Sequence, residues 1–563
     1  MKTLPSTFLT GIKNEPYLNT QLIAYIGNKR SLLPFLAKII SHYARETDAH
    51  SFIDFFAGTG AVSRLAKKMG FVVHANDWEF YSYLANKAYL EINTRELPYL
   101  FAEKGGVKNA IDTINHIAEK KTPAEPYISR HYAPASMEAD YRTERMFYTP
   151  RNARFIDTAR EIIEEWYPGW TLSEEQKKEK SLLISLLNYQ AAKHANTSGV
   201  FKAFHKGFGG HGKDALSRIL APIKLPYPVL ADSPYPAYTY CQDAEKLAEK
   251  ISADICYIDP PYTIHQYGSN YFMLNTIAKW DKPEVPEEKK EDGTLKVRAG
   301  IREDWKETRS DYCSRKKAEE AMERLIEKTE ARTILISYNT DGIIHYKKML
   351  DILGRHGKTE IHLTPYVKYR GGKQSINRKT HTTEYICVLR KGRKSISTPD
   401  AIEKYILMRE IRELLSAGYN PQLIGRFFDT QEDKVTLHPS LPPIRTKSFH
   451  LFLEEPDDLS CLSIKQLKTI KSNLQICICQ DREEELYHII DILKKETKKT
   501  EITKYTRRAA WLLKKFAFKK YKTQFKNAVK HIENLIKTKP DKFSKLSIML
   551  KEIKITAEKR FKG

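Results

Sequence analysis

The stretch ICYIDPPYT, residues 255–263, carries apolar residues into an acid, two prolines and a tyrosine. Residues 255–258 are typical of a short buried strand, which the prolines must end because they donate no backbone hydrogen bond. Two adjacent prolines leave nearby carbonyls without N–H partners, and Asp259 adds carboxylate oxygens. The turn is therefore expected to be rich in hydrogen-bond acceptors.

Such a turn suits a planar group that offers two N–H bonds, such as an exocyclic amine. Asp259 and the Pro260 carbonyl would accept the two N–H bonds, and Tyr262 would offer a ring on which an aromatic base stacks. The structural alternative is a strand ended by Pro260 and Pro261, with Asp259 capping a helix. This stretch alone leaves both interpretations open.

A second stretch with chemical potential is FIDFFAGTGAV, residues 52–62. Its Gly58 and Gly60 let the backbone approach a ligand closely, because glycine has no Cβ. Asp77 ends the next predicted strand, where a carboxylate accepts hydrogen bonds from the ribose hydroxyls of a nucleoside. Position 63 is serine where the dinucleotide fingerprint has glycine, which favours a nucleoside without a pyrophosphate. Two glycines that serve packing alone are the alternative.

The elements that must position these residues alternate between strand and helix, which predicts a doubly wound α/β domain. Residues 1–20 show no period and are expected to form a leading arm. A turn at 27–28 precedes an amphipathic helix. Strands are predicted within 51–56, 71–77, 238–241, 253–258, 332–339 and 381–391, and helices within 30–46, 61–70 and 243–250.

A long segment of helical stretches interrupts this domain. Its glycine-rich passage, residues 196–213, is predicted to form a mobile loop or hairpin. The basic loop at 368–380 precedes the last predicted strand. Both loops are candidates for contacts to nucleic acid, with solvated loops of no consequence as the alternative. The candidate contact residues are Asn196, Lys202, Lys206, Lys213, Arg370, Lys373 and Arg378.

Charge is concentrated near the end of the chain. The 563 residues carry a formal net charge of +24, and residues 501–563 hold 19 Lys and Arg against 5 Asp and Glu. The apolar residues of this stretch recur at near-helical spacing among lysines. Such basic helices bind nucleic acid, an anionic membrane or their own domain. We favour added phosphate contacts or target selectivity, with a plain structural bundle as the alternative.

Other features of the sequence argue against a membrane-spanning protein, a secreted protein and a metal site. The chain has no run of about 18 or more uncharged apolar residues, and its first 20 residues lack the apolar stretch of a signal peptide, so an intracellular protein is expected. Seven cysteines are scattered, and the close pair in ICIC, residues 476–479, is predicted to lie on a small buried strand. No metal site is expected.

These motifs together resemble the D12 class of adenine-specific DNA methyltransferases, whose catalytic signature is Asp-Pro-Pro-Tyr. The resemblance rests on YIGNKRSLLP before the first strand, FFAGTG after it, and DPPY about 200 residues later, which is the alpha-type motif order. It covers residues 21–392. It implies a Rossmann-like, S-adenosylmethionine-dependent methyltransferase sheet, with an inserted helical or hairpin target-recognition region and an additional α-rich basic C-terminal domain.

The resemblance also implies a domain division and site residues. The catalytic domain would comprise residues 1–94, with the cofactor motifs, and 236–392, with the catalytic motif. Residues 95–235 would recognise the target, and 393–563 would form the C-terminal domain. The implied catalytic residues are Asp259, Pro260, Pro261 and Tyr262. The implied S-adenosylmethionine site comprises Tyr25, Lys29, Asp54, Phe56, Gly58, Gly60, Asp77, Trp78, Asp243 and Asp259.

The implied partner is double-stranded DNA, from which the target adenine must be flipped. The resemblance further implies functional pairing with a restriction endonuclease, no membrane, a monomer or weak dimer, and a cytoplasmic, nucleoid-associated place in a prokaryotic cell. Two alternatives remain. One is a bifunctional restriction-modification enzyme with a C-terminal nuclease or DNA-binding domain, and the other is methylation of RNA or of a protein amide.

Overall fold

The computed structural model describes the chain except for residues 1–10, 25, 211–214, 368–380, 393–399, 416–417, 420, 432–433, 448–451, 454–455, 457, 480 and 563. The chain forms two compact units, residues 1–397 and 398–563, and each is described by itself. Within the described residues, no helix combines the length and the apolar character needed to cross a membrane.

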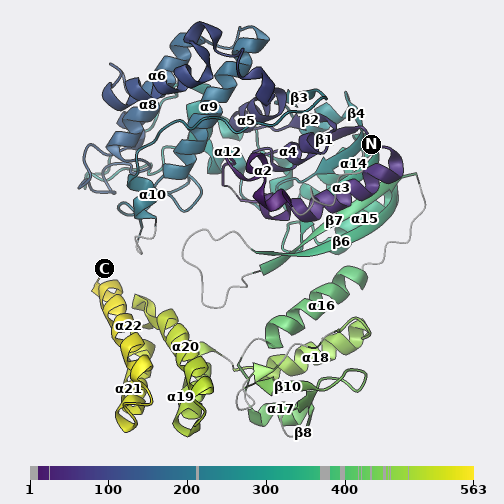
Figure 1. Cartoon of the computed structure of the whole chain (residues 1–563), viewed down its shortest axis with the longest axis vertical. Coiled ribbons are helices and arrows are strands. Elements are labelled where there is room, and N and C mark those ends of the chain that lie inside the picture. The colour runs from purple at the N-terminus through teal and green to yellow at the C-terminus, as the bar shows by residue number, and fades with distance from the viewer. Residues whose placement is uncertain are drawn as a thin grey trace. The chain divides into compact units, whose positions relative to one another are not determined.

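The first unit is built on a seven-stranded sheet with the order β3-β2-β1-β4-β5-β7-β6. Neighbours from β3 to β5 pair in parallel, and β7 lies antiparallel between β5 and β6 (Figure 1). The strand order reverses between β1 and β4, and open α/β sheets bind ligands in the crevice outside such a switch point. The strands are β1 Ser51–Asp54, β2 Val72–Asn76, β3 Ala237–Tyr240, β4 Ser252–Ile258, β5 Glu330–Asn339, β6 Gly357–Val367 and β7 His381–Lys391.

The Rossmann-like sheet expected from the sequence is confirmed. β4 lies in the middle of the sheet, and its last four residues are buried, which explains why they are apolar or aromatic without alternation. The strand ends at Ile258, directly before Asp259 and the two prolines. β6 pairs with β7 along its whole length and had no counterpart among the predicted strands.

Helices flank the strands of this sheet along the chain. The predicted amphipathic helix is α3, Leu33–Thr47, and it buries one apolar face that includes Leu36 and Ile40. α4, Ala61–Lys68, begins after Gly60, whose φ of +82° a glycine adopts without strain. α11, Ala244–Ala248, follows β3, while α14, Ala318–Lys328, and α15, Tyr346–His356, flank β5.

The inserted segment and the helices that directly follow β4 form a helical block that shares one hydrophobic core with the sheet. The long helix α9 is buried over much of its length, and α5 and α13 pack against it (Figure 1). The described residues 195–210 form turns without a strand, so the hairpin predicted there is wrong for those residues. The helices of this block are α5 Phe80–Asn86, α6 Gly106–Lys120, α7 Ile128–Tyr132, α8 Pro150–Trp166, α9 Glu174–His194, α10 Leu216–Leu220, α12 Tyr267–Asn270 and α13 Phe272–Lys279.

Residues 11–20 pack on the domain, so the predicted leading arm is wrong for this described part. Arg64 of α4 is 1% exposed and donates hydrogen bonds to the carbonyls of Tyr17, Thr20 and Gln21 at 3.3, 3.1 and 3.1 Å. Its guanidinium carbon lies 3.7 Å from the ring centroid of Tyr89, an arrangement that adds a cation–π attraction. The spacing of apolar residues in the sequence gave no sign of these contacts, because the residue that makes them, Arg64, is polar and buried.

We expect the substitution Arg64→Met to lower the free energy of unfolding of the first unit by about 3 kcal/mol or more, because two buried carbonyls and one part-buried carbonyl lose their donor. Urea unfolding followed by tryptophan fluorescence measures the change. Arg130→Met is the control, since Arg130 is 68% exposed and its side chain makes a weak 3.9 Å ion pair. Equal stability losses in the two variants would contradict this account of the N-terminal packing.

The second unit contains helices and a small antiparallel sheet of order β11-β10-β9-β8, which the sequence had not predicted. The predicted strand at 476–479 is wrong, because helix α18 continues to Cys477 and Ile476 is 49% exposed. The elements are α16 Asp400–Leu415, α17 Pro421–Phe427, β8 Asp429–Gln431, β9 Lys434–Thr436, β10 Ile444–Lys447, β11 Phe452–Leu453, α18 Ile464–Cys477, α19 Arg482–Lys495, α20 Lys499–Phe516, α21 Lys522–Thr538 and α22 Ser544–Lys562.

The lysine-rich end of the chain folds as α19–α22 around a common hydrophobic core. The spacing of apolar residues predicted this amphipathic packing, and Leu512, Phe516 and Ile532 are buried in it. Beside the core, one ligand atom from each of Cys479, Glu484 and His488 lies within 4.8 Å of the others. Because exposed acidic groups gather without an ion in many proteins, the expected absence of a metal site stays a prediction.

Candidate functional site

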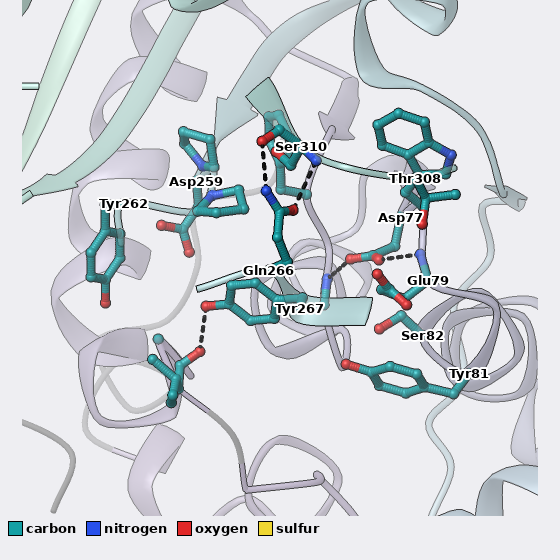
Figure 2. A pocket seen from close by; sticks show the side chains of 17 residues that line it. Asp77, Glu79, Tyr81, Ser82, Asp259, Tyr262, Gln266, Tyr267, Thr308 and Ser310 are labelled. Carbon is teal, nitrogen blue, oxygen red and sulfur yellow. Dashed lines mark hydrogen bonds between the residues drawn. The ribbon is translucent and has the colours of Figure 1, made fainter. Parts of the chain in front are cut away.

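A cavity of about 730 Å³ lies at the carboxyl ends of the central strands (Figure 2). Among the described residues that line it, the charged side chains are three carboxylates, Asp77, Glu79 and Asp259. Both stretches singled out in the sequence contribute to it. The lining residues are Ile26, Gly27, Phe56, Gly58, Asp77, Trp78, Glu79, Tyr81, Ser82, Asp259, Pro260, Pro261, Tyr262, Gln266, Tyr267, Thr308 and Ser310.

Asp77 connects the glycine turn after β1 to the loop after β2. Its carboxylate accepts hydrogen bonds from the backbone amides of Gly58 at 2.7 Å and Glu79 at 2.8 Å. Burial raises the pKa of Asp77 to about 6, although both amides favour the charged form. Each oxygen keeps a second acceptor position, so Asp77 fixes the turn and can still bind a ligand.

Glu79 is a site residue that the sequence analysis missed. Its carboxylate accepts a 2.5 Å hydrogen bond from the side-chain amide of Asn275 on α13. Burial, with a further contribution from Asp77, raises the pKa of Glu79 to about 7. The sequence did offer a sign of this residue, because Glu79 is an acid only two residues after Asp77 in the run NDWEF.

Asp259 follows β4 directly, and its side chain is 12% exposed at the cavity wall. The ammonium of Lys29 lies 3.0 Å from Asp259 Oδ1 and also donates a hydrogen bond to Glu384 of β7. Burial raises the pKa of Asp259 to about 7, with Lys29 opposing the increase and Glu384 adding to it. Lys29 is thus held by two carboxylates behind the cavity, where the sequence predicted a contact to a cofactor.

Tyr262 and the turn at Ile26 and Gly27 form the adjacent wall. The hydroxyl of Tyr267 donates to the Ile26 carbonyl and the Ile26 amide donates to the hydroxyl of Tyr271, each at 2.8 Å. A Cβ on Gly27 would lie 3.2 Å from the hydroxyl oxygen of Tyr267 and 3.4 Å from that of Tyr262. The glycine therefore brings backbone against two tyrosines that border the cavity.

We expect Gly27→Ala to weaken ligand binding in this cavity about tenfold, because a φ of +85° costs about 1 kcal/mol for alanine and the new methyl group crowds the Tyr267 hydroxyl. Isothermal titration with S-adenosylmethionine, the cofactor that the sequence resemblance implies, and with its demethylated product measures the change. Gly11→Ala is the matched control, since its Cβ would meet no atom within 4 Å. Unchanged affinity in the Gly27 variant would remove this turn from the binding site.

A segment between α13 and α14, residues 308–312, also borders the cavity, and the sequence gave no sign of this. The side-chain amide of Gln266 donates to the Ser310 carbonyl at 3.2 Å and accepts from the Ser310 amide at 2.9 Å (Figure 2). Tyr312, two residues further on, packs edge to face on Phe56 with ring centroids 5.1 Å apart. These contacts fix the segment over the glycine turn.

A second hollow of about 540 Å³ shares Phe56, Trp78 and Ser310 with the first. Asp243 lines this hollow and is absent from the lining of the first cavity. Its carboxylate also caps α11 by accepting a 3.1 Å hydrogen bond from the Lys246 amide. Trp78 and Phe56 thus border both hollows.

Asp54 and Gly60, like Lys29 and Asp243, are predicted cofactor residues that do not line the first cavity. Asp54 is 1% exposed and accepts a 2.8 Å hydrogen bond from the hydroxyl of Ser63, while burial raises its pKa to about 8. A Cβ on Gly60 would lie 2.6 Å from the side-chain oxygen of Asn86. Both residues therefore shape the turn beside the cavity, and their predicted contact to the cofactor stays a prediction.

The predicted DNA contacts divide into three groups. Asn196 is 0% exposed and donates to the Met146 carbonyl at 2.9 Å, so the prediction that it contacts bases is wrong. It was misread because a glycine-rich loop often exposes its polar residues. Lys202 and Lys206 are exposed. Lys213, Arg370, Lys373 and Arg378 lie outside the described residues, as does Tyr25 of the predicted cofactor site.

Comparison with known proteins identifies the family. A model described as D12 class N6 adenine-specific DNA methyltransferase matches residues 25–334. Type II methyltransferase M.NlaIII of Neisseria lactamica is 32% identical, covering 65% of this chain and 99% of the relative. Type II methyltransferase M.FokI of Planomicrobium okeanokoites is 32% identical over 65% of this chain and 52% of the relative. Modification methylase StsI of Streptococcus sanguinis is 31% identical over 63% of this chain and 50% of the relative.

The aligned region spans nearly all of M.NlaIII and about half the length of M.FokI and StsI. The matched residues 25–334 include the glycine turn, Asp77 and the Asp-Pro-Pro-Tyr turn, which border one cavity. The family recognised from the sequence motifs is therefore confirmed. The chain belongs to the D12 class N6 adenine-specific DNA methyltransferases.

Proposed function

We propose that the protein transfers a methyl group from S-adenosylmethionine to the N6 amine of adenine in a specific double-stranded DNA sequence. One observation carries the proposal. Asp259, Pro260 and Tyr262 border the same cavity as Gly58 and Asp77, so acceptors for an amine and features that suit a nucleoside are adjacent. The family supports adenine as the base and a methyl group as the transferred unit.

The cavity fits S-adenosylmethionine, which supplies an electrophilic methyl group on a sulfonium. The three lining carboxylates favour a ligand that carries positive charge. Asp77 would accept hydrogen bonds from the ribose hydroxyls, and Gly27 and Gly58 allow close backbone approach. Trp78 and Phe56 would flank the cofactor's adenine, with Asp243 in the second hollow near its polar edge.

The chain's own residues would activate the target amine. The amine is a poor nucleophile because its lone pair is delocalised into the adenine ring. If Asp259 and the Pro260 carbonyl accept both N–H bonds, they favour a pyramidal nitrogen and stabilise the positive charge that develops during transfer. Tyr262 would stack on the flipped base, which offsets part of the cost of extruding it. Fixed orientation of the amine supplies the remaining acceleration.

We further propose roles for the remaining parts of the chain. The insertion, residues 95–235, would read the target sequence, with the exposed Lys202 and Lys206 on DNA phosphates. The basic second unit would add phosphate contacts. Three relatives are named type II methyltransferases or modification methylases, which supports functional pairing with a restriction endonuclease. We also propose that the chain acts as a monomer or weak dimer on the DNA of a prokaryotic nucleoid.

Transfer of labelled methyl groups to purified substrates tests the proposal. Plasmid DNA is expected to accept label on adenine, whereas RNA and total protein accept none. Label in RNA or protein would favour the alternative substrates. Cleavage of unmethylated plasmid in the presence of Mg²⁺ would support the bifunctional alternative, and we expect the plasmid to stay intact.

We expect the methylation rate to rise with pH through about 7, because only the ionised Asp259 accepts both the amine's hydrogen bond and its developing charge. Burial is the main cause of the raised pKa, so the carboxylate is protonated and inactive below it. A profile of kcat/KM from pH 5.5 to 9 should show an acid limb near 7 and a plateau above. A rate that falls as pH rises through this range would contradict the role given to Asp259.

A further inference from the structure

Behind the proposed reaction centre lies a buried cluster of three charged residues from distant parts of the chain. Lys29 precedes α3, Asp259 follows β4, and Glu384 lies on β7. The side chains of Lys29 and Glu384 are 3% and 0% exposed. Lys29 pairs with both carboxylates, so the cluster holds one positive and two negative charges in their ionised forms.

Glu384 is fixed by β5 as well as by Lys29. Its Oε1 accepts from the Ser337 hydroxyl at 3.1 Å, and its Oε2 accepts from the side-chain amide of Asn339 at 3.2 Å. Asn339 is the direct register partner of Glu384 in the antiparallel β5–β7 pair. Ser337 and Asn339 are neutral donors, and among the described residues Lys29 is the cation that pairs with the Glu384 carboxylate.

The second carboxylate changes what Asp259 offers to an amine. A lone Lys29–Asp259 pair would be neutral overall and would attract a developing positive charge weakly. With Glu384 sharing the ammonium, the cluster keeps a net negative charge in a buried place, where electrostatic effects are large. Glu384 lies beyond residues 25–334, so the antiparallel strand β7 supplies this contact from outside the matched region.

We propose that Glu384 is a positioning residue for methyl transfer, which draws the Lys29 ammonium away from full neutralisation of Asp259 and so keeps Asp259 a strong acceptor toward the target amine. This inference rests on the proposed function. Among the described residues, the other titratable groups that interact with the cluster are Asp54, Tyr257, Tyr262 and Tyr385, and all four stay in place in the variants below.

The charge of Glu384 has a predictable effect on the pH profile. Glu384 contributes to the raised pKa of Asp259, so removing its charge lowers that pKa. Asp259 then ionises at lower pH yet becomes a weaker acceptor, because Lys29 pairs with it alone. A lower plateau rate and an acid limb at lower pH should therefore appear together, a combination that general loss of structure does not produce.

The test is Glu384→Gln in the full-length enzyme, which keeps the shape and most hydrogen bonds of the side chain. We expect kcat on the alkaline plateau to fall about tenfold or more, with KM for S-adenosylmethionine and DNA changed less than about threefold. The acid limb should move to lower pH. Glu360→Gln is the control, since Glu360 lies on the neighbouring strand β6 and bonds Tyr43 away from the cavity.

A step slower than methyl transfer could hide the effect of Glu384→Gln on the rate. The double variant Lys29→Met/Glu384→Gln then tests the same role through the pH profile. Lys29 lowers the pKa of Asp259 more than Glu384 raises it, so the acid limb of the double variant should lie above that of the unchanged enzyme. An unmoved limb in both variants, or an unchanged plateau in Glu384→Gln, would overturn the role of Glu384. Absence of methyl transfer by the unchanged enzyme would instead count against the proposed function.

Discussion

Replacing Asp259 by asparagine is expected to reduce the rate of methyl transfer by a factor of about 10³ or more, because the amine loses a charged acceptor in a buried site. An asparagine either presents an N–H group to the amine or offers only a neutral carbonyl. Lys29 keeps Glu384 as a partner in this variant, so the fold should survive. Single-turnover transfer of labelled methyl groups to plasmid DNA measures the rate.

The lower rate reports on the methyl-transfer step only if the variant still binds the cofactor and DNA. Cofactor affinity and DNA retention in gel shifts are expected to change less than about threefold, because Asp259 is one of several lining groups. Asp254→Asn is the matched control, since Asp254 lies at the opposite end of β4 and bonds Ser51. If the Asp259→Asn variant methylates DNA at a rate within about tenfold of that of the unchanged enzyme, the mechanism is contradicted.

Asp77→Ala is expected to weaken cofactor binding by about 30-fold or more, since it removes a charged acceptor worth about 2 kcal/mol or more. The same change frees the amides of Gly58 and Glu79, so the glycine turn loses the contact that fixes it. Isothermal titration with S-adenosylmethionine measures the loss. At saturating cofactor the variant should recover most of the methylation rate, because Asp77 does not contact the amine in the proposed arrangement.

Asp351→Ala provides the comparison for this variant, because Asp351 is exposed on α15. It should bind the cofactor as the unchanged enzyme does. If Asp77→Ala binds equally well, the ribose site lies elsewhere. If it binds weakly and also fails to recover at saturation, Asp77 has a further role in holding the reacting groups.

The central strands and the cavity that they border could be predicted from short stretches of sequence. The run of residues 255–258 followed by two prolines indicates a buried strand that must end there, because proline cannot continue the ladder. Asp259 is therefore placed by its immediate neighbours. The same holds for Gly58 and Asp77, which follow adjacent strands and must meet at the carboxyl edge of the sheet.

Contacts between distant segments could not be predicted in this way. Lys29 and Glu384 are 355 residues apart, and they meet only because the register of β7 against β5 turns Glu384 inward. Ser310 reaches the cavity through a loop whose sequence has no periodicity. Asn196 shows the converse error, because a polar residue in a glycine-rich loop was buried to hold that loop together. Burial of polar side chains depends on tertiary partners that single-sequence patterns do not encode.

Sequencing of genomic DNA with single-molecule detection of modified bases tests the central claim most directly. The full-length chain, and separately its Asp259→Asn variant, would be expressed in a bacterial host that lacks DNA methyltransferases. The account predicts N6-methyladenine at one short recurring sequence with the unchanged chain and none with the variant. Modification of another base, no modification by the unchanged chain, or equal modification by the variant would contradict it.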